Sequence, residues 1–461
     1  MLIIGAVYAI YLPLTTYDDL YYDAQQYWRM GEQYFATGQF SFLSFATTQR
    51  GYLLSLLLSP LTQLTTAANM SPLDITRVLG TVLAAVCFGW AGPALWQATA
   101  GGKPVGLARR LVFAGLGFVL WRDYFNFSLS DFPSLLALAI ALICLLRGQG
   151  LRSGVLAGVA LAAALNMRPI YQAALPAVAL LALLPPLHRA RWWGLVRSAG
   201  LVVGAAAVLL PQAYSNYHQV GSKSPLVLAV EPGHPDIFLQ QLTWGLLMQK
   251  YETSIGDDYP KPFVIFEEAH GRMMWEANGS KQFDSAGEYV RLCASRPGRA
   301  IGIWARHLFN GLDVQYPTPY IQAVYVPTWP LAWLNYTVIW GGALVLLLRR
   351  WQRPTPAWVH PGLALLALLT PCLVTMITAM ECRFLLPLHM LLSAAVAFGA
   401  VPGQWWRAAP AKWRLAVVAS YAVVLVGGFW ASATAQEHLA FTPRTILPDL
   451  PGYSLWGGIG N

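Results

Sequence analysis

The chain has 461 residues, of which 56% are hydrophobic and 11% charged, and its mean hydropathy is +0.47. A soluble domain carries about a quarter charged residues, so this composition excludes an ordinary soluble enzyme and predicts a multi-span membrane protein. The net charge of +9 does not indicate nucleic-acid binding, because the basic residues lie in short segments between apolar runs and form no basic face with interleaved aromatic residues.

Apolar runs recur along nearly the whole chain. In hydrocarbon such runs must be helical, because only internal hydrogen bonds can satisfy the backbone. We therefore predict an all-α polytopic bundle of about eleven spans. The expected spans are Leu2–Leu14, Thr76–Trp96, Gly106–Trp121, Phe132–Leu146, Leu151–Met167, Ile170–Leu184, Leu195–Leu210, Leu331–Leu348, Pro361–Ala379, Phe384–Val401 and Trp413–Trp430. Gly51–Leu64 is apolar but short, and we expect a re-entrant or tilted helix there.

The basic residues between these spans all fall on one side if the chain starts inside, as the positive-inside rule requires. The expected organisation has four parts. Residues 1–213 form a membrane core that includes a catalytic first external loop at 15–51. Residues 214–330 form an external loop with interfacial helices, 331–432 form further spans, and 433–461 form a short external tail.

An acidic, aromatic-rich segment follows the first apolar run, and its spacing predicts a surface helix from Asp19 to Phe35 with Asp18 or Asp19 as its N-cap. One stripe of this helix carries, at i, i+4, i+7 and i+11, Asp23, Tyr27, Met30 and Tyr34. A carboxylate on an aromatic stripe can bind a sugar or take a hydroxyl proton. The alternative for Asp23 is a solvated first-turn acid that the helix dipole favours.

The polar region 214–330 contains two helical patterns, Pro262–Ala277 and Ala286–Leu312. The second pattern carries arginines against an apolar face. It therefore predicts either a helix lying in the membrane interface or a packed helix of a small external subdomain.

A set of short motifs resembles the GT-C fold glycosyltransferases, such as the protein O-mannosyltransferases and the lipid A aminoarabinose transferases. The first-loop motifs are Asp23-Ala-Gln-Gln-Tyr27, Gly38-Gln-Phe40-Ser41 and Arg50-Gly-Tyr52-Leu-Leu. Later motifs follow in the family's order: Asp131-Phe-Pro-Ser, Gly154-Val-Leu-Ala-Gly158, Asn166-Met-Arg168-Pro169, Ser295-Arg-Pro-Gly-Arg299 and Glu381-Cys-Arg383-Phe384. The sequence departs from the family where two prolines are missing after Arg50.

The resemblance implies transfer of a sugar, with inversion, from a polyprenyl-phosphate carrier to an acceptor hydroxyl on a lipid, glycan or protein. The site would lie on the periplasmic or extracellular side of the cell membrane. The implied catalytic acids are Asp23, Asp19 and Asp131; the implied ligands of the donor phosphate are Arg50, Arg168 and Arg383; and the implied pocket residues are Tyr22, Tyr27 and Glu381. The resemblance leaves the choice between Asp19 and Asp23 open. It does not fix metal dependence, and Asp131 could hold a divalent cation together with Asp23.

Two other classes remain as alternatives. A polymerase or ligase of lipid-linked glycans would have a large arginine-rich external loop, and 214–330 is only modestly rich in arginine. A transporter or flippase would place ionisable residues deep within spans and would show repeated halves. Here the acids and arginines gather towards one predicted face, where we expect them to meet in a single pocket.

Overall fold

The computed structural model describes residues 1–100, 104–185, 190–229, 236–256, 263–324, 328–348, 359–399, 406–407 and 409–441. The chain divides into two compact units. Unit 1 comprises Met1–Ala114, Trp121–Gly233 and Trp351–Pro371, and unit 2 comprises Gly115–Leu120, His234–Arg350 and Cys372–Asn461.

Unit 1 is helical throughout the part that the structure describes. Its helices are α1 (Leu2–Tyr11), α2 (Tyr22–Gln33), α3 (Tyr52–Ala68), α4 (Pro72–Val86), α5 (Gly92–Ala100), α7 (Asp131–Arg147), α8 (Leu151–Met167), α9 (Leu175–Leu183) and α10 (Trp192–Val220). A π-helical turn at Cys87–Ala91 joins α4 to α5. Two more helices, α6 (Leu107–Trp121) and α16 (Val359–Thr375), have residues in both units.

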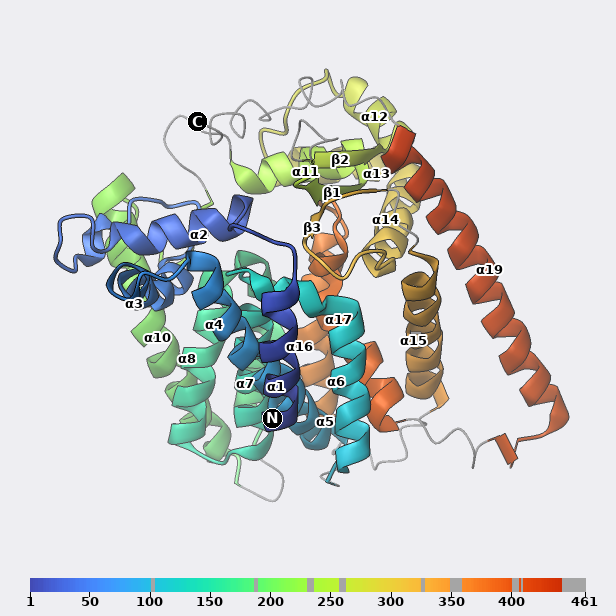
Figure 1. Cartoon of the computed structure of the whole chain (residues 1–461), viewed down its shortest axis with the longest axis horizontal. Helices are drawn as coiled ribbons and strands as arrows, with labels where there is room; N and C mark the ends of the chain where they lie inside the picture. Colours follow the sequence, from blue (N-terminus) through green and yellow to red (C-terminus); the bar gives the residue numbers. More distant parts are fainter. Residues whose placement is uncertain are drawn as a thin grey trace. The chain divides into compact units, whose positions relative to one another are not determined.

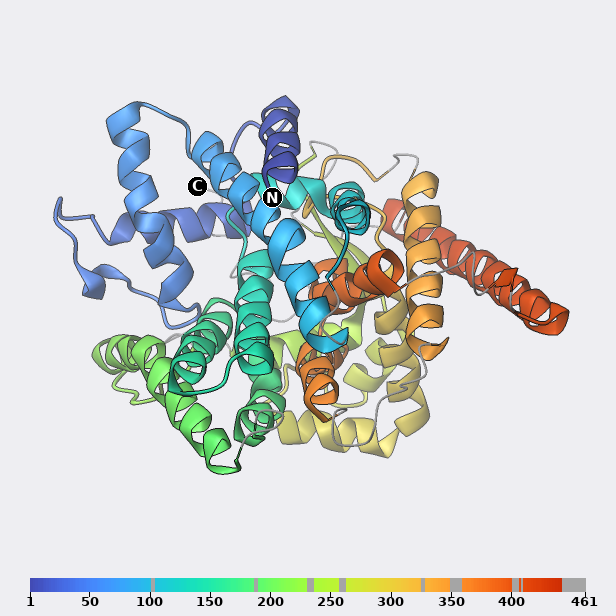
Figure 2. The same ribbon diagram turned by 90° about the horizontal axis from the view of Figure 1, so that it is seen from below.

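Glycines let α8 and α10 approach each other closely. A Cβ atom on Gly154 would lie 2.2 Å from the carbonyl oxygen of Arg197, and one on Gly204 would lie 2.0 Å from that of Val155. Any larger side chain would force the two helices apart, which is the usual reason for small residues at helix contacts in membranes. Figure 2 shows the two helices running along each other.

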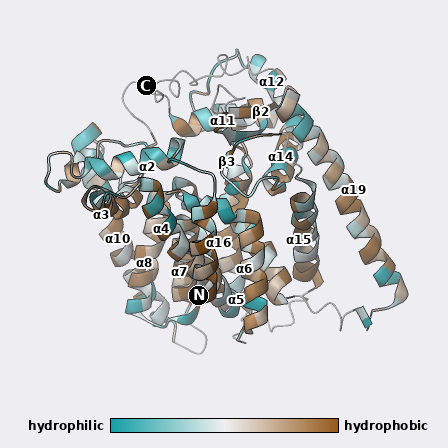
Figure 3. Ribbon diagram, viewed as in Figure 1, coloured by the Kyte–Doolittle hydropathy of each residue, from teal (hydrophilic) through white to brown (hydrophobic). Residues whose placement is uncertain are grey.

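Helix α2 runs across one end of the α4, α7 and α8 bundle instead of along it (Figure 1). Its outward surface is hydrophilic, whereas the bundle helices are mostly hydrophobic (Figure 3). Its inward stripe joins the core of unit 1, which also takes side chains from α3, α7, α8 and α9. Members of this core include Tyr27, Met30, Tyr34, Leu58, Leu142, Leu161 and Leu181. The structure thus confirms a helix with an aromatic stripe, although it begins and ends inside the predicted bounds.

Unit 2 contains a small sheet as well as helices, so the all-α prediction is wrong in this region. The elements are α11 (Ile237–Leu247), β1 (Met248–Ser254), β2 (Phe263–Glu267), α12 (Ala269–Glu276), α13 (Ala286–Ser295), α14 (Pro297–Leu312), β3 (Tyr320–Ile321), α15 (Trp329–Leu348), α17 (Leu386–Ala394) and α19 (Ala411–Phe441). The strand order is β2-β1-β3, with β1 antiparallel to β2 and parallel to β3.

The predicted helix Pro262–Ala277 is a strand followed by a short helix. The strand part reads Phe-Val-Ile-Phe-Glu, and aromatic and β-branched residues of this kind favour a pleated surface. The predicted helix Ala286–Leu312 is two helices, α13 and α14, because the chain leaves helical geometry at Arg296 before Pro297.

Five helices in the described part of the chain are long and apolar enough to cross a membrane: Pro72–Ala100, Trp192–Val220, Trp329–Leu348, Cys382–Gly399 and Ala411–Ala440. These helices indicate a membrane protein, but they correct the prediction of eleven spans. Other predicted spans are helices of 10–17 residues, whereas a span needs about 20. Hydropathy marks an apolar run and not the ends of a helix: the run predicted at Leu195–Leu210, for example, lies inside α10, which extends from Trp192 to Val220.

The predicted boundaries meet the helices in different ways. The boundary at 213 lies inside α10 and the boundary at 432 lies inside α19, whereas the one at 330 falls close to the start of α15. The apolar piece predicted at Gly51–Leu64 is the helix α3. Of the predicted tail at 433–461, residues 442–461 lie outside the described residues.

Candidate functional site

The start of α2 has an unusual backbone. Its N-cap is Tyr21, whose side chain makes no capping hydrogen bond, and the first helical residue, Tyr22, has a φ of +40°. A bulky residue in this left-handed region costs about 1–3 kcal/mol, and such strain gathers at functional sites. The prediction that Asp18 or Asp19 caps the helix is therefore wrong: the Asp19 carboxylate instead accepts the N–H of Leu20 at 2.7 Å.

Asp23 and Arg50 form the first acid–arginine pair. The guanidinium of Arg50 lies 2.6 Å from the Asp23 carboxylate, and it also donates to the Tyr27 hydroxyl and the Gln26 side-chain oxygen, each at 3.1 Å. Burial opposes the Arg50 charge, but Asp23 and Tyr27 outweigh it and raise the pKa of Arg50. Both members of the pair keep over a fifth of their side-chain surface exposed, 22% for Arg50 and 23% for Asp23, so a ligand can reach them.

Asp131 and Arg168 form the second pair. Asp131 is the first residue of α7, and Arg168 is the C-cap residue of α8, held in extended geometry before Pro169. Here the acid is sealed, with 2% of its side chain exposed, and the arginine remains at 17%. The pairing joins the start of one bundle helix to the end of the next.

Hydrogen bonds between side chains and backbone groups connect the chain segments that carry the two pairs within unit 1. The Ser128 hydroxyl, three residues before Asp131, donates to the carbonyl of Ala24 on α2 at 3.1 Å. The Leu53 N–H, three residues after Arg50, donates to the side-chain oxygen of Asn166 at 2.9 Å. Asp23, Arg50, Asp131 and Arg168 therefore lie on chain segments that contact one another in a closed series.

A buried chain of amides fixes the segment that carries Arg50. Gln212 of α10 accepts the N–H of Tyr52 at 3.3 Å and the Asn166 amide at 2.8 Å, and it donates to Asn216 at 2.9 Å. A Cβ atom on Gly51 would lie 1.9 Å from the Asn166 carbonyl oxygen, so this position needs glycine. Neither Gln212 nor Asn216 was predicted from sequence, although amide side chains in a long apolar run are a signal that could have found them.

Glu381 and Arg383 form a third pair, which belongs to unit 2. The Arg383 guanidinium donates to Glu381 at 2.5 Å, and the Thr253 hydroxyl of β1 donates to the other oxygen of Glu381 at 3.0 Å. Each predicted arginine thus binds one predicted acid. The four residues of unit 1 lie on contacting segments, whereas Arg383 belongs to unit 2 together with Glu381.

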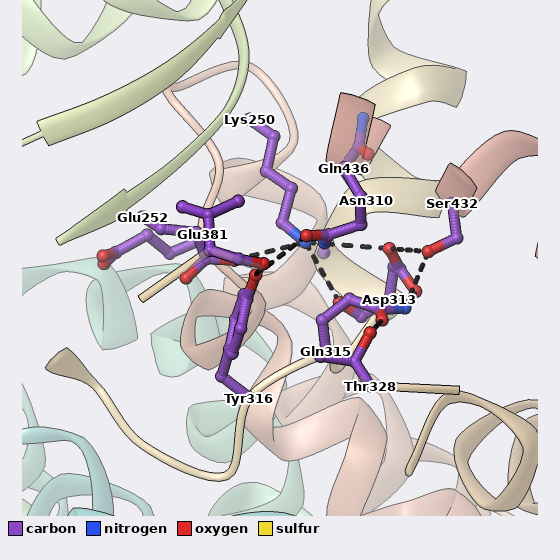
Figure 4. Close-up of polar contacts among 12 residues, drawn as sticks. Lys250, Glu252, Asn310, Asp313, Gln315, Tyr316, Thr328, Glu381, Ser432 and Gln436 are labelled. Carbon is purple, nitrogen blue, oxygen red and sulfur yellow. Dashed lines mark hydrogen bonds and ion pairs between the residues drawn. The ribbon is translucent and has the colours of Figure 1, made fainter. Parts of the chain in front are cut away.

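A second buried charged cluster in unit 2 was not predicted. The Lys250 ammonium is fully buried and lies 3.2 Å from Glu252 and 3.6 Å from Asp313 (Figure 4). Asp313 also accepts hydrogen bonds from Gln315, Tyr336 and Ser432. A short polar stretch, Gln-Lys-Tyr-Glu-Thr, after an apolar helix gave little sign that these side chains would be buried.

The chemistry open to the unit 1 pairs is acid–base catalysis and binding of an anion. A carboxylate can take a proton, and a guanidinium presents a planar fork that matches phosphate oxygens. Among the residues that the structure describes, no group of three or more His, Cys, Asp or Glu side chains is arranged so that it could hold a metal ion. Comparison with protein-family models, known proteins and solved structures gives no match, so the resemblance to GT-C transferases rests on the sequence motifs alone.

Proposed function

We propose that the protein is a membrane glycosyltransferase of the GT-C type. It would move a sugar from a polyprenyl-phosphate donor to an acceptor hydroxyl on the outer side of the cell membrane, with inversion. One observation supports this proposal above the others: the accessible pair Asp23–Arg50 holds, 2.6 Å apart, the acid and the cation that such a transfer needs. The apolar helices that could span a membrane fit a substrate that arrives through lipid.

The pairing suggests how the donor activates the site. In the structure Arg50 neutralises Asp23, and an acid held in such a pair is a poor base because its anion is stabilised. The donor phosphate is a diester with one negative charge, like a carboxylate, and its oxygens compete for the same guanidinium; its charge grows as it leaves as a monoester. Binding of the phosphate to Arg50 would free Asp23 to act as a base, so that the acid becomes reactive only when the donor is present.

The transfer itself then needs one base. Asp23 removes the proton of the acceptor hydroxyl, and the oxygen attacks the anomeric carbon through an oxocarbenium-like transition state. The bond from that carbon to the phosphate oxygen breaks, and its electrons leave with the polyprenyl phosphate, which needs no proton. Arg50 stabilises the charge that grows on the departing phosphate. Of the two candidate bases, Asp23 fits better than Asp19, since the Asp19 carboxylate already accepts a hydrogen bond from the N–H of Leu20.

The second pair has a supporting part in this proposal. Asp131 is sealed from solvent and would orient Arg168, whose more exposed guanidinium would then bind the substrate phosphate. Tyr27 holds Arg50 through its hydroxyl, with the guanidinium 4.9 Å from its ring centre, and Tyr22 stands exposed at the strained start of α2. The phosphate role expected for Arg383, which pairs with Glu381 in unit 2, stays a prediction from the sequence motif alone.

The experiment compares Asp23→Asn with wild type in purified enzyme, using a panel of polyprenyl-phosphate hexoses and pentoses. Asp23→Asn should lower transfer by about 10²–10⁴-fold, the usual loss of a general base, and should keep donor binding. The matched control is Glu32→Gln, which changes an exposed acid of the same helix. Wild-type turnover in Asp23→Asn, with the control also unchanged, would refute the role of this acid.

A further inference from the structure

The buried cluster in unit 2 carries an excess of negative charge. Three carboxylates, of Glu252, Asp313 and Glu381, lie together with two cations, Lys250 and Arg383. All five side chains are nearly or wholly buried, the most exposed being Arg383 at 9%. An unpaired buried charge is expensive, and a titratable group usually avoids the cost by becoming neutral. The cluster therefore calls for one more positive charge.

The number of hydrogen-bond donors around each carboxylate indicates which acid binds the extra proton. Asp313 receives the Gln315 amide at 2.5 Å, the Tyr336 hydroxyl at 2.6 Å and the Ser432 hydroxyl at 3.0 Å, besides its share of Lys250. So many donors stabilise a carboxylate in its ionised form.

Glu381 also accepts hydrogen bonds, from the Arg383 guanidinium at 2.5 Å and from the Thr253 hydroxyl at 3.0 Å. Within the described part of the cluster, Glu252 receives the least stabilisation from hydrogen-bond donors, because its donor is a lysine that also contacts Asp313.

An orphaned acceptor lies in the same place. The Asn310 side chain is fully buried, and its oxygen has no hydrogen-bond partner among the described residues. Its nitrogen donates to the carbonyls of Gln249, the residue before Lys250, and of Arg306. Figure 4 shows Asn310 among the side chains that gather round the Lys250 ammonium. This buried acceptor lacks a donor, and an added proton gives the cluster one more donor and also corrects its charge.

We infer that unit 2 contains a buried proton-binding site in which Glu252 takes up one proton and Lys250 then serves Asp313 alone. The charged and titratable groups that face Glu252 are Lys250 of β1, Asp313 after α14, and Glu381 with Arg383 at the start of the Cys382–Leu385 turn. Its sheet neighbours add no charge, because Glu252 pairs with Val264 of β2 and the next residue with Tyr320 of β3.

The electrostatic shift of Glu252 agrees with this geometry. Burial raises the pKa of Glu252 to about 6; Lys250 opposes the rise, and Glu381 and Asp313 add to it. Proton uptake has a structural consequence, because Asp313 ties two predicted spans to the same point, α15 through Tyr336 and α19 through Ser432. Releasing Lys250 from Glu252 strengthens its attachment to Asp313. The inference is independent of the proposed transferase activity.

The test is an infrared titration of the full-length protein carrying isotope-labelled glutamate, so that aspartate carboxyls do not contribute. The C=O stretching band of a neutral glutamic acid should disappear as the pH is raised, with a midpoint close to pH 6. The band should be absent in Glu252→Gln and should persist in Glu276→Gln, which changes an acid with 55% of its side chain exposed. A missing band in wild type, or the same band in Glu252→Gln, would overturn the inference.

A second variant keeps the test decisive if Glu252→Gln fails to fold. Asp313→Asn removes the competitor for Lys250, so Glu252 should then have the ammonium to itself and should titrate at a lower pH than in wild type. An unchanged or raised midpoint in Asp313→Asn would contradict the sharing of Lys250 between the two acids.

Discussion

Two regions of this protein use acids and cations at very different depth. In unit 1 the pair Asp23–Arg50 keeps about a fifth of each side chain exposed, and in unit 2 Lys250 is sealed at 0% between Glu252 and Asp313. An exposed pair is worth little to stability, so its partners can be exchanged for a ligand. A buried pair cannot lose one partner without leaving a charge uncompensated. Burial therefore separates a pair suited to chemistry from a pair that holds the fold.

The largest effect should come from the buried side of this comparison. Lys250→Met would leave Asp313 and Glu252 without their shared cation and should lower the free energy of unfolding by about 3–5 kcal/mol. Denaturant unfolding in detergent would measure the loss. Lys281→Met, at a lysine with 52% of its side chain exposed, should leave the free energy of unfolding nearly unchanged. Equal losses of unfolding free energy in the two variants would contradict the claim that burial separates the two kinds of charged pair.

The exposed pair should show the opposite pattern. Arg50→Ala should slow transfer by about 10²–10³-fold, because a donor that stabilises a charged leaving group is lost, and should change stability by only about 1 kcal/mol. Steady-state transfer and thermal unfolding on the same preparation would separate the two effects. Arg29→Ala, at an exposed arginine of α2, is the control for a lost charge. A large loss of stability with little loss of transfer would assign Arg50 to the fold.

The amide chain links the two kinds of effect. Gln212→Leu would remove the partner of the Tyr52 N–H, the Asn166 amide and the Asn216 oxygen, and should lower the free energy of unfolding by about 1–3 kcal/mol, the cost of one buried group left unsatisfied. Because Tyr52 follows Arg50 by two residues, transfer should fall as well. Unfolding and transfer assays at several donor concentrations would test this. Loss of stability with unchanged kinetics would show that the chain does not position Arg50.

The smallest effect is a dependence on pH. Glu252 has a pKa of about 6 in the fold against an ordinary value of 4.5, so the fold binds its proton more tightly than the unfolded chain does. This contribution to stability is complete below pH 4.5 and falls by about 2 kcal/mol as the pH rises to about 6. Glu252→Gln, whose side chain is neutral at every pH, should keep this contribution to stability throughout the pH range. The difference in unfolding free energy between variant and wild type should thus grow from pH 4.5 to 6, and a constant difference would contradict the linkage.

The sequence alone determined that this is a helical membrane protein, that an aromatic stripe follows Asp23, and which charged residues stand beside the motifs. Composition and the helical period suffice for these statements, because they depend on local transfer free energies. The residues Arg50, Arg168 and Arg383 were also identified from local motifs.

Tertiary structure decided the rest. It paired each of those arginines with an acid far along the chain or just beside it, it placed a sheet in unit 2, and it buried Lys250, Glu252 and Asp313 together. No local pattern encodes these outcomes, because Lys250 and Asp313 are 63 residues apart and meet only when β1 packs beside the end of α14. Depth of burial, which divides exchangeable pairs from locked ones, depends on that packing and not on residue type.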